Sequence, residues 1–326
     1  MARLLWVVLG VSGVAALQPS APRSRLGVQT RLSDNEESWP SDSSDQTIID
    51  FEAAAAAKKT TTQADASETK LKLLLAIAAT ARGETADLRA KAAVSEVVTD
   101  LEAVGAGQAY TLDDLGGRWS LAYSSTQLFR SSPFWMAGRA TCTTPSQAAQ
   151  YDWFCEMHRA ATRVGTIGAV RQIISPFDRT LISEFETDVA AFPQTIGGAA
   201  PFTVTGAIVS SADIEDCTEG VLTLLMNDVA VKGSNVPGLR QVLDAGLKID
   251  TRRVADVIKN AIDVPQPSFR TTFVDGDLRV SRDEDDNVFV YVLESKDPRP
   301  TAYDDAPYDL GIPKILTGLR DALFGN

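Results

Sequence analysis

The stretch SFRTTFVDGDLRVSRDEDDNVFVYVL, residues 268–293, decides the fold class of this chain. Three short runs in it have the residues of strands, namely Ser268–Val274, Leu278–Arg282 and Val288–Leu293, and Leu278–Arg282 alternates apolar and polar residues. Such runs predict short strands, and alternation places one face of a strand in a core. Between the runs lie Asp275-Gly276 and Asp285-Asp286-Asn287, whose residues tolerate the positive φ of tight hairpin turns. The stretch therefore predicts three consecutive antiparallel strands.

The same alternation appears further upstream. In Gly117–Ser124, the side chains of Trp119, Leu121 and Tyr123 share one face of a predicted strand. Three more runs have strand character: Thr180–Thr187, Pro201–Ser211 and Gly220–Lys232. Many short strands joined by hairpin turns favour an antiparallel barrel or sandwich over a parallel sheet.

Two segments before these strands have a helical period instead. Apolar residues recur at intervals of three and four in both: Leu71, Leu74, Leu75 and Ala78, then Leu88, Ala92, Val94, Val97, Val98 and Leu101. Gly83 separates them, so we expect a helical hairpin over residues 66–105. A helical spacing in Arg253–Ile262 predicts one short helix before the last three strands. The fold class is therefore mainly β (α+β), a helical hairpin followed by a barrel over residues 110–296.

The amino-terminal residues have the composition of a targeting sequence. Residues 1–33 hold four arginines and no acid, and their apolar run Leu4–Leu17 is too short to span a bilayer as a helix. We expect a cleavable signal peptide followed by a Ser- and Arg-rich transit peptide, as in plastid proteins of algae with secondary plastids. Secretion is the alternative, although three cysteines cannot all pair and the chain has no N-glycosylation sequon.

The remaining boundaries follow from composition. Residues 34–65 are acidic and Ser-rich at their start and predict a disordered linker. Residues 66–296 form the predicted domain, and residues 297–326 predict a tail that ends in a short amphipathic helix.

Charge excludes several partners. The chain has 326 residues and a net charge of −12, and without residues 1–33 its 27 basic and 43 acidic residues leave −16. Nucleic-acid binding depends on Lys and Arg neutralising phosphates, so we expect no nucleic-acid partner. Attraction to anionic membranes is equally absent, so any lipid contact must come from apolar burial.

Metal and catalytic motifs are absent from the sequence. The cysteines Cys142, Cys155 and Cys217 are far apart, and His158 is the only histidine, so we predict no metal site and no cofactor. Cys155 and His158 are close in sequence, but such pairs are more often surface segments than catalytic ones. Neither a Walker loop nor a G-x-S-x-G elbow is present outside the targeting sequence, so we predict that the chain is not an enzyme.

Trp119 opens the first predicted strand in the pattern Gly-x-Trp, which resembles the lipocalins. The resemblance implies that the indole closes one barrel end and that a late arginine, Arg279 or Arg282, lies across it. A core tryptophan without ligand contact is the alternative.

The order of motifs over residues 70–294 resembles the plastid lipid-associated protein family, the fibrillins. Five motifs carry the resemblance: Lys70 with Leu74-Leu75, Ile77, Thr80 and Arg82-Gly83; Leu101-Glu102-Ala103; Leu115, Gly117, Trp119, Leu121 and Tyr123-Ser124-Ser125; Val164-Gly165 with Gln172 and Ile174; and Phe273–Arg282 with Asn287–Val290. Residues 138–160, which contain Cys142, Cys155 and His158, look like an insertion relative to the family pattern.

The resemblance implies a lipocalin-like barrel at plastid thylakoids or plastoglobules that binds or organises carotenoids, quinones and lipids. The candidates for the barrel lumen are Trp119, Tyr123, Phe185, Phe202, Phe273, Arg279 and Phe289. The candidates for membrane or lipid contact are Phe129, Phe134, Trp135 and Met136, which crowd a predicted loop over residues 129–137 and could equally plug the core.

Two other functions stay open from the sequence. One is an enzyme acting on a carotenoid or lipid inside the barrel, with an acid such as Glu184 as proton donor. The other is a scaffold for a photosynthetic or biosynthetic complex, with residues 138–160 and 297–326 as docking surface.

Overall fold

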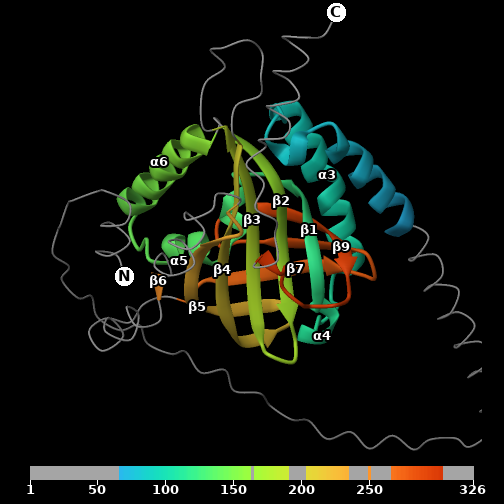
Figure 1. The fold of residues 1–326 in the computed structure, drawn as a ribbon. Coiled ribbons are helices and arrows are strands. Elements are labelled where there is room, and N and C mark those ends of the chain that lie inside the picture. Colours follow the sequence, from blue (N-terminus) through green and yellow to red (C-terminus); the bar gives the residue numbers. More distant parts are fainter. Residues whose placement is uncertain (1–65, 163–164, 191–202, 235–248, 251–265, 304–326) are drawn as a thin grey trace, which may run out of the picture.

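The computed structural model describes residues 66–162, 165–190, 203–234, 249–250 and 266–303 (Figure 1). Its nine strands are β1 Gly117–Ser124, β2 Gly165–Ser175, β3 Thr180–Ala190, β4 Thr203–Thr218, β5 Val221–Lys232, β6 Ile249–Asp250, β7 Ser268–Val274, β8 Leu278–Arg282 and β9 Val288–Ser295. Its helices are 66–78, η1 Ala81–Gly83, α3 Leu88–Gly105, α4 Leu112–Leu115, η2 Leu128–Ser131, α5 Pro133–Ala140 and α6 Pro145–Thr162.

The strands form a closed antiparallel barrel. They pair in the order β4-β3-β2-β1-β9-β8-β7-β5, and β5 pairs again with β4 to close the ring of eight. The two-residue strand β6 pairs with the edge of β5 outside this ring. The predicted fold class, mainly β with amino-terminal helices, is confirmed. Strand β2 was not predicted from alternation, because the apolar residues at its end occupy both faces: Val170, Ile173 and Ile174 are all buried.

The helix 66–78 and α3 pack together on one side of the barrel (Figure 1). The face that we predicted for the first helix is wrong. Leu73 and Ile77 are buried there, whereas Leu71 and Leu75 are exposed. A salt bridge of 2.8 Å from Lys70 Nζ to Asp275 Oδ2, in the turn before β8, holds the helix in this rotation.

Asp87 is the N-cap of helix α3, and its carboxylate accepts a hydrogen bond from the amide of Ala90; the helix buries Val94, Val98 and Leu101. Its predicted first apolar residue, Leu88, is 87 % exposed. The hairpin therefore covers the barrel with only part of its apolar surface.

Several sequence predictions lie outside the described residues. They are the targeting sequence 1–33, the linker 34–65, the helix 253–262, the lumen candidate Phe202 and the tail after residue 303.

Candidate functional site

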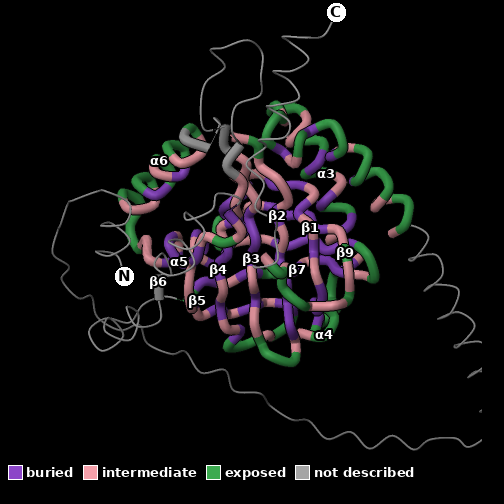
Figure 2. The backbone as a smooth tube through the Cα atoms, viewed as in Figure 1, coloured by how far each residue is buried: buried purple, intermediate pink, exposed green. Residues whose placement is uncertain are grey.

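The inner wall of the barrel is apolar and aromatic. Trp119, Phe185 and Phe289 belong to one core cluster with residues from seven of the eight barrel strands, all but β8, and Figure 2 shows the buried positions running along those strands. Trp119 is completely buried, and its Nε1 donates a hydrogen bond of 2.8 Å to the carbonyl of Leu115 at the end of α4. The indole thus lies at the barrel end where β1 begins, as the Gly-x-Trp pattern predicts.

Two lumen candidates lie instead on the outer face. Tyr123 and Phe273 pack with the helical hairpin, in a second core cluster outside the barrel. The physical reason is a β-bulge in each strand. The register shifts between Leu121 and Tyr123 in β1, and between Thr271 and Phe273 in β7. One extra residue in a strand reverses the face of every side chain after it.

Arg279 occupies the interior together with Trp119. It is 0 % exposed, and its Cζ lies 5.2 Å from the Trp119 ring centroid and 4.3 Å from that of Tyr291. Its Nη2 donates to Gln172 Oε1 at 2.5 Å. The other arginine that we considered, Arg282, instead pairs with Glu102 of α3 at 2.7 Å. Tyr291 and Gln172 were missed, because apolar residues next to them occupy both faces of their strands and alternation therefore does not mark their direction.

The segment 128–140, η2 and α5, forms a plug at the opposite barrel end, where β1 ends. Its side chains Phe129, Trp135 and Met136 are buried in the same cluster as the inner wall, and Phe134 is half-buried. Gln172 Nε2, on the inner face of β2, donates to the carbonyl of Ser131 at 2.6 Å. The predicted loop is therefore helical, and its aromatic side chains take the core position that was the alternative to lipid contact.

Ion pairs hold the plug to the β8–β9 turn. Asp285 pairs with Arg130 at 2.7 Å and with Arg139 at 2.5 Å, and Arg130 is almost fully buried. Helix α6, the body of the apparent insertion, adds a hydrogen bond of 3.0 Å from Tyr151 Oη to the carbonyl of Trp135. The insertion and the plug thus form one unit that covers this end of the barrel.

Replacing Asp285 by asparagine is expected to loosen this plug. The change leaves two guanidinium groups without their shared carboxylate, so the free energy of unfolding should fall by about 1–3 kcal/mol. Hydrogen exchange of the amides in residues 128–140 should accelerate at the same time. The control is Asp286→Asn, whose ion pair with Arg270 is exposed, and which should change stability by less than about 0.5 kcal/mol. Equal effects of the two variants would contradict the proposed attachment.

Cys155 is buried in this unit, and His158 is half-buried in it. Burial raises the pKa of the Cys155 thiol to about 11, which keeps it protonated and a poor nucleophile at neutral pH. The His158 ring packs edge-on against Phe129 at 4.6 Å between centroids and lies 4.9 Å from Trp135. The pair therefore has the surroundings of a packing element rather than of a catalytic dyad.

Burial also lowers the pKa of His158, which predicts an acid-sensitive plug. The unfolded chain protonates this residue near pH 6.5 and the folded chain only at lower pH, so stability falls as the pH decreases through this range. We expect the urea midpoint of the protein to drop between pH 7.5 and pH 5, and to drop less in His158→Phe, since His158 is the only histidine. An identical pH dependence in both proteins would count against this assignment.

Glu184 is not available as a proton donor inside the barrel. Its neighbours Leu181 and Phe185 point inward, whereas its carboxylate accepts hydrogen bonds from Thr301 and Tyr303 on the outer face. Among the buried residues that the structure describes, Glu184 is the only carboxylate. The described interior therefore offers no fully buried acid to the enzymatic alternative.

An open cleft of about 570 Å³ lies between η1, the residues after β1 and the end of α6. Two basic side chains that line this cleft donate hydrogen bonds to nearby backbone carbonyls. Arg82 donates to the carbonyls of Ile167 and Gly168, and Lys91 donates to that of Ser125. The cleft lies where the hairpin, the barrel and the insertion meet.

Within the described part of the chain, no three His, Cys, Asp or Glu side chains are grouped so that they could hold a metal ion. Over the same residues, none of the helices has the length and apolar character needed to cross a membrane.

The family model PAP_fibrillin matches residues 67–292, more than half of the chain. No curated protein and no solved structure matches it.

Proposed function

Because this chain belongs to the PAP_fibrillin family, the plastid lipid-associated proteins, we propose that it binds apolar plastid molecules inside its barrel and organises them at a lipid surface. Members of this family are plastid-associated and generally structural rather than enzymatic. The proposed ligands are carotenoids, quinones or lipids, and the proposed locations are thylakoids or plastoglobules, reached through the signal and transit peptides.

One observation carries the proposal: the barrel is closed, and its inner wall joins aromatic and aliphatic side chains from seven of its eight strands. A concave apolar site with few polar groups is the ordinary form of a site for a hydrophobic molecule. The plug is a separate helical segment held by ion pairs, so it provides an element whose displacement would admit a ligand.

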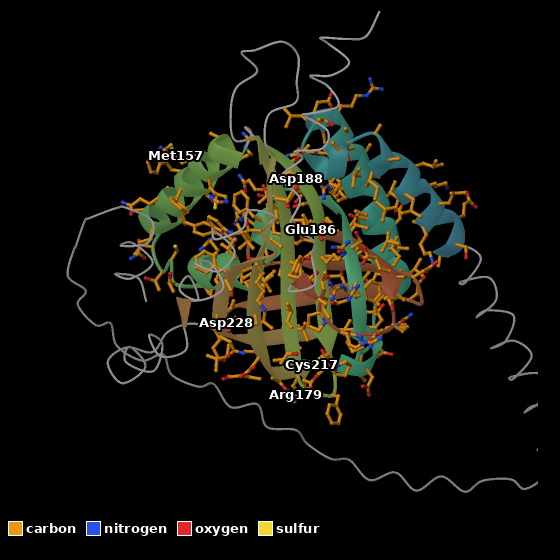
Figure 3. All side chains as sticks on the ribbon, viewed as in Figure 1. Met157, Arg179, Glu186, Asp188, Cys217 and Asp228 are labelled. Carbon is orange, nitrogen blue, oxygen red and sulfur yellow. The ribbon has the colours of Figure 1, made fainter. Side chains whose placement is uncertain are left out.

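Contact with the lipid surface is proposed for the outer face of α6. Trp153 and Met157 lie one helical turn apart and are 58 % and 53 % exposed, and Figure 3 shows Met157 directed away from the barrel. The predicted contact residues Phe129, Trp135 and Met136 are buried, so α6 presents the exposed apolar side chains of this region. Tryptophan and methionine suit an interface without cationic attraction, because they contribute apolar area.

The test is isolation of the protein from its native cells, followed by flotation and mass spectrometry of the lipids that it retains. We expect the protein in low-density lipid fractions, with bound carotenoid, quinone or lipid. The variant Trp153→Ser/Met157→Ser should lose most of its flotation. Its control is Phe177→Ser, 95 % exposed in the β2–β3 turn at the other barrel end, which should float like the unaltered protein. A protein that is free of lipid and absent from lipid fractions would refute the proposal.

A further inference from the structure

The barrel interior holds a positive charge without a negative partner. Leu278 and Val280 on either side of Arg279 face the helical hairpin, so Arg279 itself faces inward. No carboxylate pairs with it among the described residues, and its Nε and Nη1 have no hydrogen-bond partner there. Its neighbours are two aromatic rings and the amide of Gln172.

A row of polar side chains crosses the inner wall beside this guanidinium. Gln172 pairs in register with Ser183 of β3, and Ser183 pairs with Ser210 of β4. The residues two positions before and after each of them lie in the apolar interior, so all three face inward. The hydroxyls of Ser183 and Ser210 are buried and have no partner among the described residues. Four buried donor atoms of the inner wall, two of Arg279 and the two hydroxyls, thus have no partner among the described residues.

Such an arrangement is costly in a barrel that binds only hydrocarbon. Each buried, unpaired polar group costs about 1–3 kcal/mol, and a charged one costs more. Burial lowers the pKa of Arg279 to about 10, so the group still carries its charge at neutral pH. Cation–π contacts with Trp119 and Tyr291 offset part of the desolvation of this charge, but they supply no acceptor for the free N–H groups.

We infer that the barrel binds a molecule with a carboxylate head and a long apolar tail, and that its carboxylate accepts hydrogen bonds from Arg279, Ser183 and Ser210. The inference rests on the proposed function, because it names the chemical class of the ligand in the same interior. The carboxylate supplies the missing negative charge and acceptors, and the tail contacts residues such as Phe185 and Phe289. A neutral carotenoid or quinone has the tail but leaves the guanidinium charge uncompensated.

The test compares a fatty acid with its neutral ester on the full chain. The probes are cis-parinaric acid and its methyl ester, whose fluorescence rises on binding and whose tails are identical. We expect the acid to bind at least tenfold more tightly than the ester at pH 7.5. In Arg279→Gln, the acid should lose at least tenfold in affinity while the ester changes less than twofold. The control Arg270→Gln removes the same charge from an exposed side chain and should leave both affinities unchanged.

A second variant tests the same site in case Arg279→Gln does not fold. Ser183→Ala/Ser210→Ala removes both unpaired hydroxyls without adding volume, and it should weaken the acid severalfold and the ester little. Equal binding of acid and ester by the unaltered protein, or equal losses for both in the serine variant, would overturn the inference and leave the proposed function standing. Binding of neither probe, in a protein that also carries no native lipid, would refute both.

Discussion

Replacing Trp119 by alanine is expected to lower the free energy of unfolding by about 3–5 kcal/mol, the range for a large aromatic side chain in a core. The indole is completely buried, its N–H satisfies the carbonyl of Leu115, and its ring covers the guanidinium of Arg279. Truncation leaves a cavity, an unpaired carbonyl and a cation with one less aromatic contact, and all three act in the same direction. The measurement is urea unfolding followed by circular dichroism.

Trp153→Ala is the matched control for this prediction. Trp153 is exposed on α6, so its truncation should change stability by less than about 0.5 kcal/mol. Similar losses for the two tryptophans would show that Trp119 does not close the barrel end in the way the structure describes.

The second large effect is expected from Gly83→Ala, at the end of η1. Gly83 has a φ of +96°, and a Cβ added there would lie 2.0 Å from the carbonyl oxygen of Ser124 in β1. Alanine therefore has both an unfavourable backbone conformation and a clash with backbone that has to shift. We expect a loss of about 2–5 kcal/mol in the free energy of unfolding. Hydrogen exchange in residues 66–78 should also increase, since η1 joins the first helix to the barrel.

Gly107→Ala separates the two causes. Gly107 also has a positive φ, of +80°, but no atom lies within 4 Å of the added Cβ. This variant should lose only about 1 kcal/mol, the cost of the backbone conformation alone. If Gly83→Ala costs no more than Gly107→Ala, the helical hairpin is not packed on β1 as closely as described.

The local pattern of the chain was sufficient for both boundaries of three strands. The strands Gly117–Ser124, Ser268–Val274 and Leu278–Arg282 begin and end where alternation and turn residues predict. Buried residues alternate with less buried ones along most of β1 and β7, and Asp275-Gly276 separates β7 from β8, so the information needed is local. The place of Trp119 at one barrel end was implied by the resemblance of its Gly-x-Trp pattern to the lipocalins.

The local pattern did not reveal on which face of its strand or helix each side chain lies. Tyr123 and Phe273 continue the alternation of their strands, and nothing in the sequence marks the bulges that turn them outward. The first helix is leucine-rich on more than one face, so its period did not reveal that Leu73 and Ile77 contact the barrel. The aromatic residues of 128–140 were equally compatible with an exposed loop and with a buried plug.

By itself, the sequence determined the class of the fold, the last three strands with the turns between them, the family and the apolar character of the interior. These depend on residue type and spacing along the chain. Only the tertiary structure decided which side chains meet: Arg279 with Trp119, Tyr291 and Gln172, the plug with Asp285, and Glu184 with the outer segment 301–303. Closure of the barrel brings these residues together from strands far apart in the chain. Their spacing along the chain does not indicate which of them come into contact.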